Sequence, residues 1–370
     1  MVVATLGISL PEIRQSLSLS EIEAGSLFSV IFIIAAFASA IAGRLSDKIG
    51  RKAVLVAGIS ALSAGFTLAA WSASYGFMLA PLGLAGVGYG FITPSLFALM
   101  SDLLPQRRGL GASLVSVAYG IGGFLGSIMA SSVVAWSGWR SAFFTVSVLG
   151  FFIAGLEIAG IKDVSTSGAV KLTGSYRKTL TRTLILLALA EFIGGSVFWS
   201  SASWTPTVLR SAKELSLAQT GLVMGLWGLA PMIGALLLGP LSDRLGRKRV
   251  ILGSAYPGAL AAFLAYSWLT SPTALAAGLL IFGILKASVP ILIVALAQES
   301  ASDETSGTAS GVVMSMHYLS AVVAPLVTGQ LIASTEDMIL AMILTSSVPL
   351  VLYGTLVATI QEKRSRRPPP

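Results

Sequence analysis

The chain of 370 residues is 55% hydrophobic and only 11% charged, and its formal net charge at pH 7 is +8. A charged fraction this low excludes an ordinary soluble domain, in which about a quarter of the residues are charged. The sequence contains no cysteine, which excludes disulfides, cysteine catalysis and cysteine-ligated metal sites. The basic residues lie mostly in short connections between apolar runs, so the positive charge does not indicate a nucleic-acid partner.

Apolar runs of about twenty residues recur along the whole chain, and each is long enough to cross a ~30 Å hydrocarbon layer as a helix. We therefore predict an all-α integral membrane protein. Its spans are expected at residues 21–43, 53–72, 76–103, 109–136, 140–160, 183–207, 218–241, 250–269, 273–298, 306–333 and 337–360.

A charged segment between two apolar runs occurs twice. The stretch GRLSDKIGRKAVLVAG begins at Gly43, and GPLSDRLGRKRVILGS begins 196 residues later, at Gly239. The same offset aligns Leu19 with Leu215, so the two halves are repeats with the same order of spans. The second half has six predicted spans and the first has five. We therefore expect a twelve-span design whose first span is incomplete at Met1.

The predicted spans form two membrane bundles, at residues 1–160 and 183–361. The polar and basic stretch 161–182 is expected to be a linker between them, and residues 362–370 a short tail. Nineteen of the 24 Lys and Arg residues lie on the side of the linker and tail, and four lie on the opposite side. Because cytoplasmic loops carry an excess of basic residues, we expect the linker and tail to be cytoplasmic in a multi-pass protein of the plasma membrane.

The two charged segments resemble the signature loop of the major facilitator superfamily, which joins the second and third spans of each six-helix half. The resemblance implies two six-helix bundles related by a pseudo-two-fold axis, and a secondary transporter that works by alternating access. It also implies that the loops stabilise the gate on the cytoplasmic side. The positions that match the family motif, together with their expected acidic partners, are Gly43, Asp47, Gly50, Arg51, Lys52, Gly239, Asp243, Gly246, Arg247, Lys248, Asp102 and Glu299.

Physical chemistry gives each type of motif residue a task. Gly50 and Gly246 permit a sharp reversal between antiparallel helices, and the aspartates can accept hydrogen bonds from backbone amides or arginine side chains. The basic residues can hold lipid phosphates or pair with acids at the ends of neighbouring helices. The alternative is a loop that only sets the topology, although positive charge alone requires no Asp or Gly at fixed spacing.

Three ionisable residues lie inside predicted spans, where burying a charge is costly and indicates a functional site. They are Glu191 in the seventh span, Lys286 in the tenth and His317 in the eleventh. In the family that the loops resemble, the first, fourth, seventh and tenth spans line a central cavity, which implies that Glu191 and Lys286 face one another. Lys286 is then a candidate anchor for an anionic solute, Glu191 a proton-binding coupling group and His317 a proton relay. The aromatic candidates for the cavity wall are Phe198, Trp199, Trp204, Tyr89, Tyr119 and Trp227.

Structural alternatives stay open for these residues. Glu191 and Lys286 can form a static ion pair that only holds two helices together, and His317 can instead bond to the backbone of a neighbouring helix. Trp204 and Trp268 fall where interfacial aromatic residues usually lie, so both are expected at the membrane surface.

The sequence has neither a G-x-x-x-x-G-K-[S/T] loop nor an H-E-x-x-H motif, which argues against a nucleotide-driven pump and a zinc hydrolase. We expect no enzyme activity, no cofactor and no metal. A monomer is expected, whose partners are a small-molecule solute, membrane lipids and, in the coupled case, protons.

The expected function is secondary transport of a small organic solute by symport or uniport, and Lys286 favours an organic anion. The alternatives are drug or metabolite efflux by proton antiport, and a non-transporting membrane sensor on the same fold. The segment GGFLGS at 122–127 has Gly123 where exporters of the family carry a proline, which weakens the antiport alternative.

Overall fold

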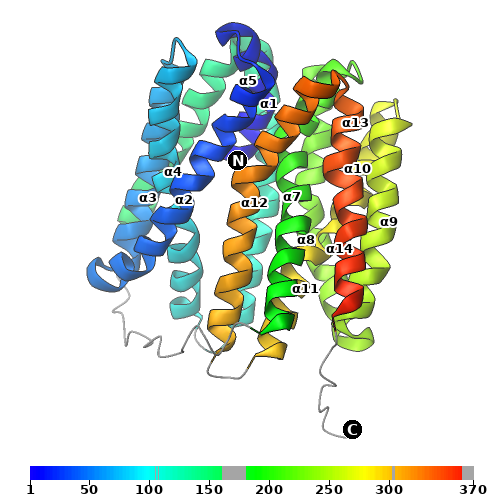
Figure 1. The fold of residues 1–370 in the computed structure, drawn as a ribbon. Helices are drawn as coiled ribbons and strands as arrows, with labels where there is room; N and C mark the ends of the chain where they lie inside the picture. Colours follow the sequence, from blue (N-terminus) through cyan, green and yellow to red (C-terminus); the bar gives the residue numbers. More distant parts are fainter. Residues whose placement is uncertain (105, 107, 161–180, 302–304, 361–370) are drawn as a thin grey trace, which may run out of the picture.

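The computed structural model describes residues 1–104, 106, 108–160, 181–301 and 305–360. Every regular element in these ranges is helical, and most helices stand side by side along one common direction (Figure 1). Nine helices of the described part are long and apolar enough to cross a membrane. These observations confirm the prediction of an all-α membrane protein.

Two predicted spans of the first half follow each other without a loop. The segment α5 consists of two helices that join at Gly138, whose backbone is not helical and whose φ of 80° favours glycine. The predicted spans 109–136 and 140–160 lie on either side of this residue. The helix α1 has 16 residues, against 30 in its counterpart α7. The helices of this half are α1 Val2–Leu17, α2 Glu21–Ile49, α3 Arg51–Ala70, α4 Tyr75–Leu103 and α5 Arg108–Gly160.

The second half contains a broken span. The predicted span 273–298 divides at Ala287 because Pro290 has no N–H to donate and its ring clashes with the carbonyl of Lys286, four residues earlier. The last span carries a short π-helix between two α-helical parts. The elements of this half are α7 Arg182–Ser211, α8 Leu217–Leu245, α9 Arg247–Ser267, α10 Pro272–Lys286, α11 Ser288–Ser300, α12 Ser306–Thr335, α13 Met338–Met342, η1 Ile343–Ser347 and α14 Val348–Thr359.

The internal repeat is visible in the start of the second span of each half. The side chain of Ser20 accepts a hydrogen bond from the backbone N–H of Glu23, whose carboxylate accepts one from the backbone N–H of Ser20. Ser216 and Gln219 form the same reciprocal cap at the start of α8. Each cap satisfies two helix donors that would otherwise lack a partner, which sets where the span begins.

In the described residues, the two halves pack against each other mainly through three helix pairs. We call the end of the bundle at which α1 and α7 finish the outer end, and the end at which α5 finishes and α7 begins the linker end. The helix α2 packs against α12, α5 against α8 and α1 against α7. Figure 1 shows α12 and α7 standing beside the helices of the first half.

Glycines allow the closest of these approaches. A Cβ added at Gly25 of α2 would lie 2.4 Å from the carbonyl oxygen of Pro325 in α12, and a Cβ at Gly329 would lie 2.5 Å from the carbonyl oxygen of Glu21. Both distances are far below van der Waals contact. The outer ends of α2 and α12 can therefore meet only because neither position carries a side chain.

An ion pair joins the halves in the same region, between Arg210 of α7 and Glu12 of α1 at 2.5 Å. Within the second half, the indole N–H of Trp204 in α7 donates to the carbonyl oxygen of Pro325 in α12 at 2.9 Å. The prediction that Trp204 lies at the membrane surface was wrong, because this tryptophan is fully buried between α7 and α12. Trp268, in contrast, is 73% exposed.

Candidate functional site

Glu191 and His317 form a buried pair between α7 and α12. The Glu191 side chain is 0% exposed, and its Oε1 lies 2.7 Å from Nδ1 of His317. Gly195, one turn further along α7, makes room for this contact. A Cβ there would lie 2.5 Å from Oγ of Ser320 and 3.2 Å from Nδ1 of His317. The glycine thus lets α12 come close enough for the imidazole to reach the carboxylate.

Lys286 is the last residue of α10, directly before the break in the tenth span. Its side chain is 4% exposed, and its Nζ lies 4.5 Å from the centre of the Phe198 ring in α7. Among the described residues, no carboxylate oxygen lies within the 4.0 Å that would make an ion pair with this ammonium group. The static ion pair of Glu191 and Lys286, one of the structural alternatives, is therefore not formed here, and the carboxylate bonds to His317 instead.

An unbroken chain of aromatic rings crosses from the first half to the second. The ring of Tyr89 in α4 lies 5.4 Å from Phe32 in α2, and Phe32 lies 4.2 Å from Trp199 in α7. Trp199 lies 5.0 Å from Phe198, which is stacked on Trp227 of α8 at 5.3 Å and 20°. These five residues, which we call the aromatic chain, place flat apolar surfaces beside both the buried pair and Lys286.

Ion pairs form at both signature loops. Nε of Arg51 lies 2.8 Å from Oδ2 of Asp102, and Nε of Arg247 lies 3.1 Å from Oε1 of Glu299. Arg247 also lies 2.7 Å from the carboxylate of Asp243. Each of these pairs lies within one half of the molecule. The side chain of Asp47, the counterpart of Asp243, lies outside the described residues.

The lysines of the two loops contact the last helix of their own half. Nζ of Lys52 donates to the carbonyl of Ile158 at 2.9 Å, and Nζ of Lys248 donates to the carbonyls of Ala358 and Ile360, both at 2.7 Å. A cation at a helix C-terminus satisfies free carbonyls and complements the helix dipole. Lipid phosphates or acidic side chains were the partners that we expected from the sequence for the basic loop residues. Binding of the two lysines to backbone carbonyls was not expected.

The loop glycines divide into two kinds. Gly50 and Gly246 have φ values of 93° and 95°, which side-chain-bearing residues rarely adopt, so both turns require glycine. Gly43 and Gly239 have no heavy atom within 4 Å of an added Cβ. Packing within the described residues therefore does not explain why glycine occupies positions 43 and 239.

A comparison with known protein families decides what kind of protein this is. The family model described as Major Facilitator Superfamily matches residues 1–325 and, in a second match, residues 184–370. The chain belongs to the Major Facilitator Superfamily. It is therefore a membrane transporter of small solutes with two helical bundles, and the expectation drawn from the signature loops is confirmed.

Individual members of the superfamily resemble the chain along most of its length. It is 27% identical to the gentisate transporter of Corynebacterium glutamicum, over 85% of this chain and 74% of the relative. It is also 27% identical to the 3-(3-hydroxy-phenyl)propionate transporter of Escherichia coli, over 98% of this chain and 91% of the relative. Among solved structures, a bacterial homolog of the human lysosomal transporter Spinster, in an inward-facing and occupied conformation, has a TM-score of 0.83 at 14% identity, over 96% of this chain and 93% of that chain.

Four of the aromatic residues expected in the cavity wall of the transporter belong to the aromatic chain, namely Tyr89, Trp199, Phe198 and Trp227. Tyr119 is not part of this chain. Its hydroxyl lies 3.2 Å from Oγ1 of Thr93, and its side chain is 45% exposed. Phe32 could not be singled out from the sequence, because one phenylalanine in an apolar span looks like any other core residue. Tyr353 of α14 was also missed, a fully buried tyrosine whose hydroxyl has no hydrogen-bond partner in the described residues.

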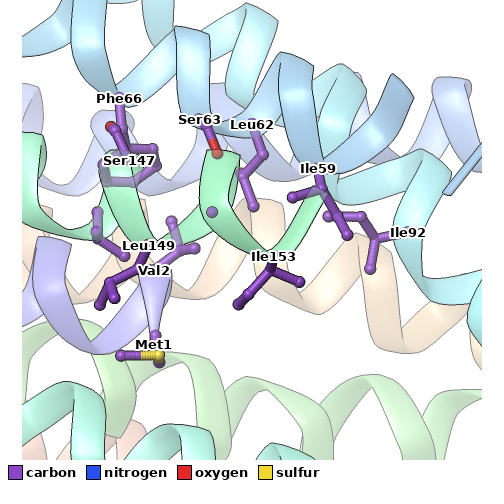
Figure 2. A pocket seen from close by; sticks show the side chains of 12 residues that line it. Met1, Val2, Ile59, Leu62, Ser63, Phe66, Ile92, Ser147, Leu149 and Ile153 are labelled. Atoms are coloured by element: carbon purple, nitrogen blue, oxygen red, sulfur yellow. The ribbon is translucent and has the colours of Figure 1, made fainter. Parts of the chain in front are cut away.

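The transporter also has a cavity of about 160 Å³ in its first half. Figure 2 shows side chains that line it, such as Met1, Leu62, Phe66 and Ile153. Its polar side chains are Ser63 and Ser147, and none of its lining side chains is charged. The lining is therefore mostly apolar.

Proposed function

We propose that the protein carries small aromatic carboxylates across the membrane by alternating access. The observation that carries the proposal is the position of Lys286, a buried cation that contacts an aromatic ring and has no carboxylate partner within 4.0 Å among the described residues. A buried ammonium group without a direct ion pair is poorly compensated, so an anion that enters the site supplies a close interaction that the protein does not.

The aromatic chain supports an aromatic solute. Its rings offer flat surfaces for offset stacking or edge-to-face contact with another ring. The names of two relatives, a gentisate transporter and a 3-(3-hydroxy-phenyl)propionate transporter, both denote aromatic carboxylates. A lysine beside aromatic rings is suited to both parts of such a solute. The ammonium group can bind the solute carboxylate, and the aromatic side chains can stack on the solute ring.

We also propose that Glu191 and His317 bind the proton that accompanies the solute. With the carboxylate ionised, the imidazole neutral and Lys286 protonated, the three side chains have a net charge of zero. A monocarboxylate adds one negative charge to this buried cluster, and one proton on the pair restores neutrality. The short contact of 2.7 Å allows either partner to hold that proton while the hydrogen bond persists.

The direction of access follows from the closed outer end. If the linker end is cytoplasmic, as the basic residues predict, the contact of α2 with α12 closes the halves toward the outside. In the proposed cycle the signature loops stabilise the alternative, outward-facing state. The ion pairs of Arg51 and Arg247 would hold each loop in shape while the linker ends of the halves come together.

Transport of gentisate by the purified full chain tests the proposed function. Proteoliposomes preloaded with unlabelled gentisate are expected to take up labelled gentisate by counterflow, which requires no driving force. An inward proton gradient is expected to drive net accumulation. A membrane potential alone is not expected to do so, because the proposed symport of one monocarboxylate with one proton moves no net charge. Protein-free liposomes are the control. If gentisate and 3-(3-hydroxyphenyl)propionate both fail to support counterflow, the proposed substrate class is wrong.

The orientation can be tested by thiol labelling in intact cells, because the natural sequence has no cysteine. Single cysteines in place of Ser167 in the linker and Ser365 in the tail are expected to resist a membrane-impermeant reagent. A cysteine in place of Lys213, beyond the outer end of α7, is expected to react. Permeabilised cells provide the control, since all three positions should then be labelled. Reaction of the tail cysteine from outside the cell contradicts the proposed orientation.

A further inference from the structure

Two buried indole N–H groups of the aromatic chain have no acceptor. Nε1 of Trp199 and Nε1 of Trp227 both lack a hydrogen-bond partner in the described residues, and the two side chains are 4% and 7% exposed. An indole N–H is a donor only, so it gains a partner only from an acceptor that enters the site. A buried donor without a partner is costly and calls for an explanation.

The surroundings of Trp227 place its N–H edge against the helix that carries Lys286. A Cβ added at Gly283 of α10 would lie 3.2 Å from Cδ1 and 3.3 Å from Nε1 of Trp227. Gly283 and Lys286 are three residues apart in α10, so they lie on the same face, about 4.5 Å apart along the helix axis. The indole N–H and the ammonium group therefore occupy neighbouring turns of one helix face.

Phe198 provides a second link between the Trp227 indole and the Lys286 ammonium group, because it contacts both. Its ring is stacked on Trp227, with the ring centres 5.3 Å apart, and the Nζ of Lys286 lies 4.5 Å from its centre. Two independent contacts, one through Gly283 and one through Phe198, thus bring Trp227 and Lys286 to the same small site. The other tryptophan, Trp199, has different surroundings from Trp227, because its ring contacts Phe32 and His317.

We propose that the solute carboxylate binds between the ammonium group of Lys286 and the indole N–H of Trp227. This inference rests on the proposed function and specifies the chemistry of its site. One carboxylate oxygen accepts from Nζ and the other from Nε1, while Phe198, which contacts both side chains, forms one wall of the site. A charge-assisted bond supplies most of the attraction, and the neutral donor fixes the orientation of the carboxylate.

A site made only of donors discriminates between closely related solutes. A carboxamide offers one acceptor oxygen, and its NH₂ group would face a donor and leave it unpaired. A site whose buried polar groups stay unpaired with the wrong ligand rejects that ligand strongly. The site therefore selects aromatic carboxylates over the corresponding neutral amides.

The test compares binding of gentisate and of its neutral carboxamide to the purified full chain by calorimetry. Trp227→Phe removes the N–H and keeps an aromatic ring. It is expected to weaken gentisate binding on the order of tenfold, the usual effect of losing one hydrogen bond to a charged group, and to leave the weak carboxamide affinity unchanged. Trp136→Phe, at a 90% exposed position, is the matched control and is expected to bind gentisate like the wild type.

A second variant controls for the loss of packing that the smaller phenyl ring of Trp227→Phe causes. Trp227→3-benzothienylalanine keeps the shape of the bicyclic ring and replaces the N–H by sulfur, so it is expected to show the same loss for gentisate. If either well-folded variant binds gentisate as tightly as the wild type, the role of Trp227 is wrong while the proposed function stands. If the wild type binds neither gentisate nor 3-(3-hydroxyphenyl)propionate, the proposed function itself fails, and this inference fails with it.

Discussion

Lys286→Met is expected to abolish gentisate counterflow, and Glu191→Gln in the same chain is expected not to restore it. The methionine keeps most of the side-chain volume and removes the charge that the proposed site uses for the solute carboxylate. Losing one partner of a buried charge pair costs about 2–5 kcal/mol, so uptake should fall about thirtyfold or more. Uptake, expression level and melting temperature are to be measured on both single variants and on the double variant.

The double variant separates binding from a static structural role. If Lys286 only neutralised Glu191, removing both charges would leave no uncompensated buried charge and would restore stability and transport together. Full transport by the double variant therefore contradicts the binding role of Lys286. Lys286→Arg is expected to keep part of the activity with altered affinity, because its charge persists in a different shape. Lys213→Met, outside the membrane spans, is the matched control for loss of a lysine.

Gly25→Ala is expected to block transport by keeping the outer end open. The added Cβ would lie 2.4 Å from the carbonyl oxygen of Pro325, a distance that backbone atoms cannot tolerate, so α2 and α12 must move apart. The Oγ of Ser29, which donates to the carbonyl of Val322 at 2.6 Å, lies one turn further along α2 in the same contact. A cysteine in place of Ser29, 5% exposed in the closed state, should react faster with an impermeant thiol reagent when Gly25→Ala is present.

The control for this experiment is Gly253→Ala in α9, where an added Cβ has no heavy atom within 4 Å. It carries the same chemical change within a membrane helix and is expected to preserve transport. Protein stability should be followed in both variants, because a clash relieved by unfolding would also expose the cysteine. Wild-type counterflow together with slow labelling in Gly25→Ala would show that this contact does not hold the outer end closed.

Local sequence patterns were sufficient to predict the spans and the repeat. Apolar runs long enough to cross a membrane must form helices, since the backbone finds no other hydrogen-bond partners in lipid. The turns at Gly50 and Gly246 were predictable for a related reason, because their positive φ values require glycine. Glu191, Lys286 and His317 could be selected as candidates because an ionisable side chain inside an apolar span is costly to bury and usually marks a functional site.

Pairing between helices was not predictable from these patterns. The family resemblance implied that Glu191 and Lys286 face one another, but nothing in the sequence indicated that the Glu191 carboxylate bonds to His317. Which residue it meets depends on how α7 and α12 are rotated and how closely they approach. Gly195 allows that approach. From the sequence alone, a glycine in a span does not indicate which neighbouring helix packs against it.

The sequence by itself therefore determined the number and order of the spans, the repeated loops and the identity of the buried ionisable residues. Only the tertiary structure decided that Phe32 and Tyr89 of the first half meet Trp199 of the second, and that the indole N–H of Trp227 lies beside the α10 face that carries Lys286. The physical reason is that hydrophobicity sets which segments enter the membrane. Helix rotation and contact depend on the packing of small and large side chains from segments far apart in the chain.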